Sequence, residues 1–137
     1  MGTVLAFDFG EKRTGVAVGE TALKQAHPLT VITAGHDEER LAAIEKLIRE
    51  WQPESLIVGQ PTHVDGTPHS MTARVDQFSE SLENRFHLPV REVDERLSSR
   101  DAETRLRETG HTAKTSKPFI DAVAAQLILQ TWLDTLP

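Results

Sequence analysis

The stretch VLAFDFGEKRTGVAVG, residues 4–19, decides the architecture of this chain. Residues 3–9 are almost continuously apolar, which is typical of a central strand covered on both faces. The polar turn GEKR follows at once, and residues 14–19 are expected to form a second strand, so the short spacing predicts an antiparallel hairpin. Asp8 interrupts the apolar run. Because a carboxylate removed from water must be paired, metal-bound or protonated, Asp8 is a candidate functional residue.

The downstream segments are assigned from their hydrophobic periodicity, turn residues and caps. They are expected to be a strand at 29–33, a helix at 37–51, a strand at 55–59, a helix capped by Thr67 or Ser70 and reaching Phe86, a strand at 88–93, a helix from Ser98 to Gly110, and a last helix that Pro118 opens and that runs to about Leu133. Alternating helices and strands call for parallel strands with right-handed crossovers. The sequence therefore predicts one α/β domain over residues 1–137, with a mixed five-stranded sheet flanked by helices.

Composition narrows the classes of function. The chain has 137 residues and no cysteine, which excludes disulfides, thiolate metal sites and a cysteine nucleophile and fits a cytoplasmic location. No apolar run approaches the ~18 residues that a membrane span needs, so no membrane association is expected. The net charge of −6 argues against a general nucleic-acid coat protein. Residues 96–117, however, hold six basic and three acidic residues, which fits either a local basic patch or a solvated helix.

Acidic residues occur at three meaningful places: Asp8 ends the first strand, Asp94 and Glu95 close the fifth, and Asp121 lies in the expected first turn of the last, apolar helix. Strand ends and a helix start can converge at one edge of such a sheet. Converging carboxylates repel one another unless they share a hard divalent cation such as Mg²⁺ or Mn²⁺. Cations held in this way can support phosphodiester hydrolysis.

Each carboxylate also has a purely structural explanation. The alternatives are an ion pair of Asp8 with Arg13, an ion pair of Glu95 with Arg91 or Arg96, and interaction of Asp121 with the positive end of its helix. Adjacent residues of a strand point to opposite faces, so at most one of Asp94 and Glu95 is expected to face a shared cation. Only the joint pattern of the carboxylates favours a functional site over these alternatives.

Four motifs carry a family resemblance: FDFGEKRTGVAVG (7–19), VGQPTHVDG (58–66), DERLSS (94–99) and IDAVAAQLILQ (120–130). In this order they resemble the YqgF-type pre-16S rRNA nucleases, which are also described as Holliday-junction-resolvase-like and have an RNase H-like fold. The resemblance implies metal-dependent hydrolysis of structured nucleic acid, in trimming the ends of ribosomal RNA precursors. It carries the catalytic and metal-binding roles onto Asp8, Glu95 and Asp121, with Mg²⁺ or Mn²⁺ as cofactor, and favours Glu95 over Asp94.

Basic residues near these carboxylates are candidate substrate contacts, because arginine and lysine bind phosphate groups. Lys12 and Arg13 lie in the turn beside Asp8, and their alternative role is that of an exposed hairpin tip. The remaining candidates either extend the grip on the nucleic-acid backbone or are simply solvated: Arg96, Arg100, Lys114 and Lys117.

Three functions compete at this point. The first is a divalent-metal-dependent nuclease acting on structured RNA, branched DNA or both, with a Holliday-junction resolvase as its DNA form and a homodimer as the assembly that suits a symmetric junction. The second is a kinase of the actin–hexokinase type, whose phosphate loop DFGEKRTGVA resembles, although such enzymes close two domains around the nucleotide and 137 residues supply one. The third is a non-catalytic nucleic-acid adaptor in ribosome assembly or transcription.

Overall fold

The computed structural model describes residues 2–60, 72–94 and 113–136, with residues 113–119 described by their backbone alone. The elements follow one another as β1 (Thr3–Asp8), β2 (Arg13–Glu20), β3 (Gln25–Thr33), α1 (Asp37–Trp51), β4 (Ser55–Gln60), α2 (Thr72–Phe86), β5 (Val90–Asp94) and α4 (Ala113–Leu133). Within the described ranges, no helix is both long and apolar enough to cross a membrane.

The five strands form one sheet in the order β3-β2-β1-β4-β5. β2 pairs antiparallel with both β1 and β3, whereas β4 pairs parallel with both β1 and β5. This arrangement confirms the predicted mixed sheet and the predicted hairpin. Because β1, β4 and β5 run in the same direction, their carboxyl ends lie at one edge of the sheet, where ligands commonly bind in α/β folds.

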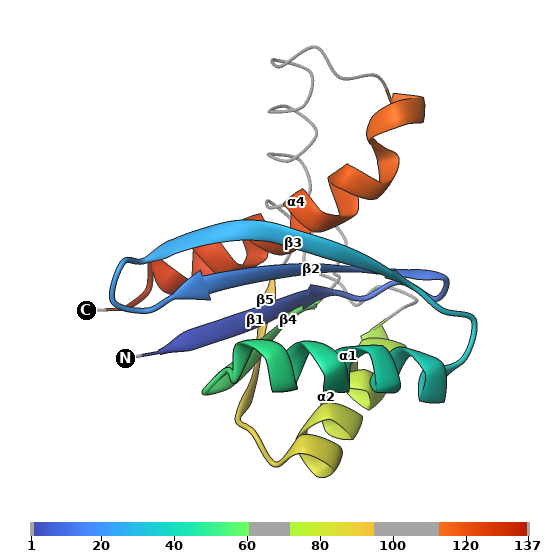
Figure 1. Ribbon diagram of the computed structural model, residues 1–137, viewed down its shortest axis with the longest axis horizontal. Helices are drawn as coiled ribbons and strands as arrows, with labels where there is room; N and C mark the ends of the chain where they lie inside the picture. Colours follow the sequence, from blue (N-terminus) through green and yellow to red (C-terminus); the bar gives the residue numbers. More distant parts are fainter. Residues whose placement is uncertain (1, 61–71, 95–112, 137) are drawn as a thin grey trace.

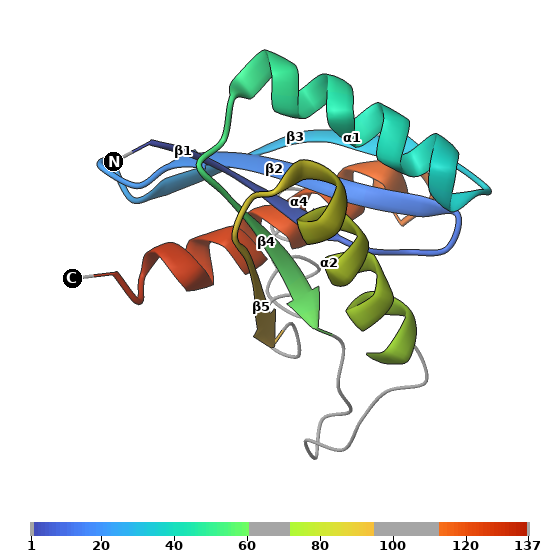
Figure 2. The same cartoon turned by 90° about the horizontal axis from the view of Figure 1, so that it is seen from below.

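Helices cover both faces of the sheet: α4 lies on one face and α1 and α2 lie on the other (Figures 1 and 2). Residues 4–7 of β1 are completely buried, which confirms the expected central strand. Leu5 and Phe7 belong to the core under α1 and α2, whereas Val4 and Ala6 belong to the core under α4. Since side chains alternate along a strand, Asp8 falls on the α4 face.

Two elements begin four or five residues earlier than the sequence predicts. β3 begins at Gln25 rather than at residue 29 and so contains Pro28. A proline is tolerated there because β3 is an edge strand, paired only with β2. α4 begins at Ala113, so Pro118 lies inside this helix instead of opening it.

Pro118 is expected to bend α4. Proline cannot donate a backbone hydrogen bond within a helix and bends the helix that contains it. The N-terminal part of α4 projects away from the sheet in Figure 1, while the rest of the helix lies along it. The expected helix at 98–110 and the expected caps at Thr67 and Ser70 lie outside the described residues.

Candidate active site

A hollow of about 240 Å³ opens at the carboxyl end of β1. Its charged lining residues come from β1, the following turn, the start of β2 and α4, and they are Asp8, Glu11, Lys12, Arg13 and Asp121. The structure therefore brings together two of the three predicted carboxylates and two of the predicted phosphate-binding cations. These groups come from both ends of the chain, so the hollow exists only in the folded protein.

Gly15 explains how α4 comes so close to the end of β1. In the antiparallel ladder Gly15 is the direct partner of Asp8. A Cβ atom at this position would overlap the backbone carbonyl oxygen of Asp121. Only glycine lets the helix backbone rest on β2 at this point. The contact places residue 121 of α4 next to the strand pair that carries Asp8.

Arg13 links the two sides of the hollow. Its Nε atom lies 3.1 Å from Oδ2 of Asp121, and the side chains are 34% and 25% exposed, respectively. The ion pair of Arg13 with Asp8 that the sequence left open is thus accompanied or replaced by one with Asp121. The recorded contact is made by Nε, and the other donors of an arginine fork are its Nη groups, which commonly bind a phosphate.

The helix-dipole explanation of Asp121 fails. Asp121 is not in the first turn of its helix, as the sequence suggested, because α4 begins eight residues earlier, at Ala113. The interaction of a charge with the macrodipole falls off within the first turn. The macrodipole therefore does not explain why Asp121 lies beside Arg13 in an otherwise buried stretch of α4.

Strand alternation also separates the two acidic candidates of β5. Val90 packs against the core under α1 and α2, whereas Val93 packs against the core under α4. Asp94, one residue further, is accordingly on the α2 side of the sheet and not on the side of Asp8. Glu95, Arg96 and Arg100, and the side chains of Lys114 and Lys117, lie outside the described residues. In the ranges that are described, no three acidic or histidine side chains are grouped to hold a metal ion.

Two features near this edge were not predicted from the sequence. The first is Arg40, whose side chain is only 2% exposed and which contacts the turn after β1. A signal for it existed: Arg40 lies four residues before Ile44, on the stripe of α1 that faces the core.

The second unpredicted feature is a pair of carboxylates on the α2 face. The Gln60 side-chain amide donates to Oδ1 of Asp76 at 2.7 Å and to Oε2 of Glu92 at 2.5 Å. Desolvation and the neighbouring Asp76 raise the pKa of Glu92 to about 6. No sequence spacing connects these three residues, because they come from β4, α2 and β5.

Comparison with solved structures defines the class of this fold. The Holliday junction resolvase of fowlpox virus superimposes with a TM-score of 0.62 at 8% identity, covering 98% of this chain and 99% of the other. RuvC of T. thermophilus, solved in complex with a Holliday junction substrate, gives a TM-score of 0.60 at 16% identity, covering 96% and 92%. The chain thus has the RNase H-like fold of RuvC, as the sequence resemblance implied.

Sequence comparison then identifies the family. Residues 2–135 match the RuvX family, described as Holliday junction resolvase. A protein of Dechloromonas aromatica named "Putative pre-16S rRNA nuclease" is 66% identical over 98% of this chain and 92% of its own length. A protein of the same name from Thiobacillus denitrificans is 54% identical over 97% and 92%. The chain belongs to the RuvX family, and the predicted membership of a nuclease family is confirmed.

Proposed function

We propose that this protein is a divalent-metal-dependent nuclease that hydrolyses phosphodiester bonds in structured nucleic acid and processes the ends of pre-16S rRNA. The observation that carries the proposal is the single hollow that holds Asp8 and Asp121 beside Lys12 and Arg13. Acidic groups that bind a cation and basic groups that bind a phosphate are the two components that such a reaction requires. The nuclease names of relatives that are 50–66% identical supply the substrate class.

Asp8, Glu95 and Asp121 are proposed to hold the Mg²⁺ or Mn²⁺. The donor set fits these ions, because both prefer carboxylate oxygens and usually bind through a few carboxylates and the substrate phosphate. When bound, the metal would supply a water nucleophile at neutral pH and charge stabilisation at phosphorus. The choice of Glu95 over Asp94 is supported by the position of Asp94 on the opposite face of the sheet from Asp8.

Lys12 and Arg13 are proposed to bind the phosphate next to the scissile bond. Lys12 is exposed, the Arg13 side chain is 34% exposed, and both line the hollow, so both cations can reach a ligand that lies across the edge of the sheet. Arg13 also orients the carboxylate of Asp121 through their ion pair. The outlying cations Arg96, Arg100, Lys114 and Lys117 are proposed to extend this contact along the nucleic-acid backbone.

The decisive experiment is cleavage by the purified full-length chain. Labelled RNA carrying a 16S precursor end and a four-way DNA junction are incubated with Mg²⁺, Mn²⁺ or chelator, with the wild type beside Asp8→Asn. The variant keeps the size of the side chain but removes its charge, so we expect it to fold and to cleave roughly a hundredfold or more slowly. Asp134→Asn, at the other end of α4, is the matched control and should cleave like the wild type.

Each alternative gives a different result. Full activity of Asp8→Asn would remove the acidic site from the mechanism. Cleavage of the junction but not of the RNA would identify the resolvase form, and sedimentation would then test the homodimer that a symmetric junction suits. Salt-sensitive binding without product in any metal would identify a non-catalytic adaptor. ATP binding, seen as thermal stabilisation that grows with nucleotide concentration, would revive the kinase alternative.

A further inference from the structure

Arg40 is a buried cation on the face of the sheet opposite α4. It lies in the first turns of α1, and its side chain is 2% exposed. Among the described residues it is the one charged side chain that is fully buried. Burying a guanidinium costs several kcal/mol unless hydrogen bonds compensate. The hydrogen bonds of Arg40 therefore indicate which part of the structure its burial stabilises.

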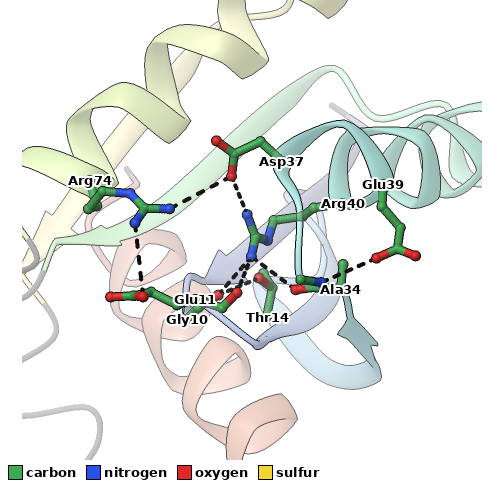
Figure 3. Close-up of polar contacts among 9 residues, drawn as sticks. Gly10, Glu11, Thr14, Ala34, Asp37, Glu39, Arg40 and Arg74 are labelled. Atoms are coloured by element: carbon green, nitrogen blue, oxygen red, sulfur yellow. Dashed lines mark hydrogen bonds and ion pairs between the residues drawn. The ribbon is translucent and has the colours of Figure 1, made fainter.

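The guanidinium of Arg40 donates mainly to backbone carbonyls of the turn after β1 (Figure 3). Its Nη2 group lies 2.6 Å from the carbonyl oxygen of Glu11 and 3.2 Å from that of Gly10. A longer contact of 3.4 Å reaches the carbonyl of Ala34. Its Nη1 group donates to Oδ1 of Asp37 at 2.7 Å, which compensates the charge. Arg40 thus joins the β1–β2 turn to the segment that leads into α1.

Other contacts also hold this turn: the Thr14 hydroxyl donates to the Gly10 carbonyl at 3.5 Å, Arg74 lies 4.0 Å from the Glu11 carboxylate, and the Phe9 ring packs 4.8 Å from the Phe78 ring. Residues 9–12 lie between β1 and β2 and outside the strand ladder. The carbonyl of Lys12 accepts a hydrogen bond from the backbone amide of Ala34 at 3.0 Å, and the Arg40 guanidinium stacks 4.7 Å from the centre of the Phe9 ring. The position of the turn is consequently set from the α1/α2 face, where Arg40 makes the shortest of the polar contacts, 2.6 Å to the Glu11 carbonyl.

The same turn carries the phosphate-binding groups of the candidate active site. Lys12 belongs to the turn, and Arg13 follows it and contacts Asp121 across the sheet edge. We propose that Arg40 is a positioning residue for substrate binding: from behind the sheet it holds the β1–β2 turn so that Lys12 and Arg13 face one phosphate. This inference rests on the proposed role of these two cations, and it adds a residue that touches neither substrate nor metal.

A purely stabilising role makes a different prediction, so the test is a double-mutant cycle in nucleic-acid binding. The variants are Arg40→Lys, Lys12→Ala and their combination. Lysine keeps the positive charge but cannot present a planar fork to two carbonyls and a carboxylate. If Arg40 only stabilised the fold, folded Arg40→Lys would bind nucleic acid as tightly as the wild type. The double variant would then bind as tightly as Lys12→Ala.

The measurement is the Kd of a fluorescein-labelled four-way DNA junction and of a labelled RNA hairpin, in chelator and over a range of salt concentrations. Lys12→Ala should weaken binding roughly three- to tenfold and lower the salt slope by about 0.7–0.9, the loss of one phosphate contact. Arg40→Lys should produce a similar loss although it retains a cation. The double variant should bind no more weakly than the weaker single variant, because both changes remove the same contact.

Arg49 provides the control. It lies in the last turn of the same helix, where its exposed guanidinium pairs with Glu45 at 3.0 Å. Arg49→Lys should therefore bind nucleic acid like the wild type and combine multiplicatively with Lys12→Ala. If Arg40→Lys does not fold, as judged by circular dichroism, Asp37→Asn replaces it in the cycle with the same expectation, because Asp37 is exposed and holds Nη1 of Arg40.

The outcomes separate this inference from the proposed function. Unchanged binding by Arg40→Lys, or losses that multiply in the double variant, would overturn the positioning role while leaving the nuclease intact. A wild type that binds with the predicted cycle but never cleaves would overturn the nuclease and keep the positioning role. A wild type that binds neither nucleic acid would overturn both.

Discussion

The two faces of the sheet are packed in different ways. Under α1 and α2 the core is built from large side chains, among them Phe7, Phe78 and Leu82. Under α4 it is built on small residues of the strands, such as Ala6 and Ala17, facing the aliphatic residues of the helix. Small residues let α4 approach the strands closely, and at Gly15 the helix backbone itself touches β2. On the α4 face, smaller side chains thus allow a closer approach of the helix to the sheet.

The difference explains why Asp121 reaches the carboxyl end of β1 from the α4 face. The proximity of α4 brings Asp121 to the strand pair that carries Asp8 and within 3.1 Å of Arg13. The thicker layer on the other face supplies hydrophobic stability and, through Arg40, support for the turn from behind. Core substitutions on the α4 face should therefore reduce cleavage by more than their loss of stability accounts for, whereas substitutions of apolar core residues on the α1/α2 face should reduce stability alone.

The largest effect is expected at the closest contact. Gly15→Ala places a methyl group on the carbonyl oxygen of Asp121, so either α4 or β2 must shift. We expect a loss of about 4 kcal/mol or more in the free energy of unfolding, because backbone cannot move away as a flexible side chain does. The residual folded protein should not cleave. Chemical denaturation and cleavage per folded molecule measure the two effects.

Gly35 is the control for this glycine. A Cβ atom at Gly35 meets nothing within 4 Å. Gly35→Ala should therefore change the free energy of unfolding little, and at most raise it by about 1 kcal/mol through reduced freedom of the unfolded chain. If Gly15→Ala were as harmless as Gly35→Ala, the close approach of α4 would not be what determines the site.

A pair of core substitutions sharpens the contrast between the faces. Leu82→Ala removes a fully buried side chain under α2 and should cost about 2–5 kcal/mol. Ala125→Val adds bulk at a fully buried position of α4 and should cost about 1–3 kcal/mol. Ala125→Val should lose less stability than Leu82→Ala but more cleavage activity, since only Ala125→Val moves α4 away from the strands. Equal activity per folded molecule in both variants would contradict the division of roles.

Much of this architecture could be predicted from the sequence because its signals are local. The apolar runs of β1 and β4, the short polar turn of the hairpin and the helix-period stripe of α1 fixed the element types and the mixed sheet. The position of Asp8 at the end of β1 followed from the same run. The start of α4 was mispredicted because a proline was taken as the first residue of the helix, whereas Pro118 lies within it.

The contacts that build the site could not be predicted because they join segments far apart in the chain. Nothing local to Gly15 shows that a helix from the other end of the protein rests on it. Likewise, the position of Arg40 on the buried stripe of α1 indicates burial but not that its partners are the carbonyls of Gly10 and Glu11. The pairing of Asp76 with Glu92 depends on how α2 packs against β5, which periodicity alone does not specify.

The smallest expected effect concerns this second carboxylate pair, on the α2 face. The pKa of Glu92 is raised to about 6, so between about pH 4.5 and 6 the folded protein binds more protons than the unfolded chain. Stability therefore falls as pH rises through this window and stays lower above it. Glu92→Gln cannot titrate and should lack this fall. Its oxygen can still accept the hydrogen bond from Gln60.

The magnitude is limited by solvent, because Glu92 is an exposed residue. The full shift would correspond to about 2 kcal/mol, and screening at an exposed site reduces it to about 0.5 kcal/mol. Glu92→Gln should thus be more stable than the wild type at pH 7 by about this amount and equal to it near pH 4, with cleavage unchanged. Denaturation at both pH values measures the difference, and Glu80→Gln, on the exposed side of α2, controls for the change in net charge. A variant that loses cleavage instead would show that the α2 face takes part in the chemistry after all.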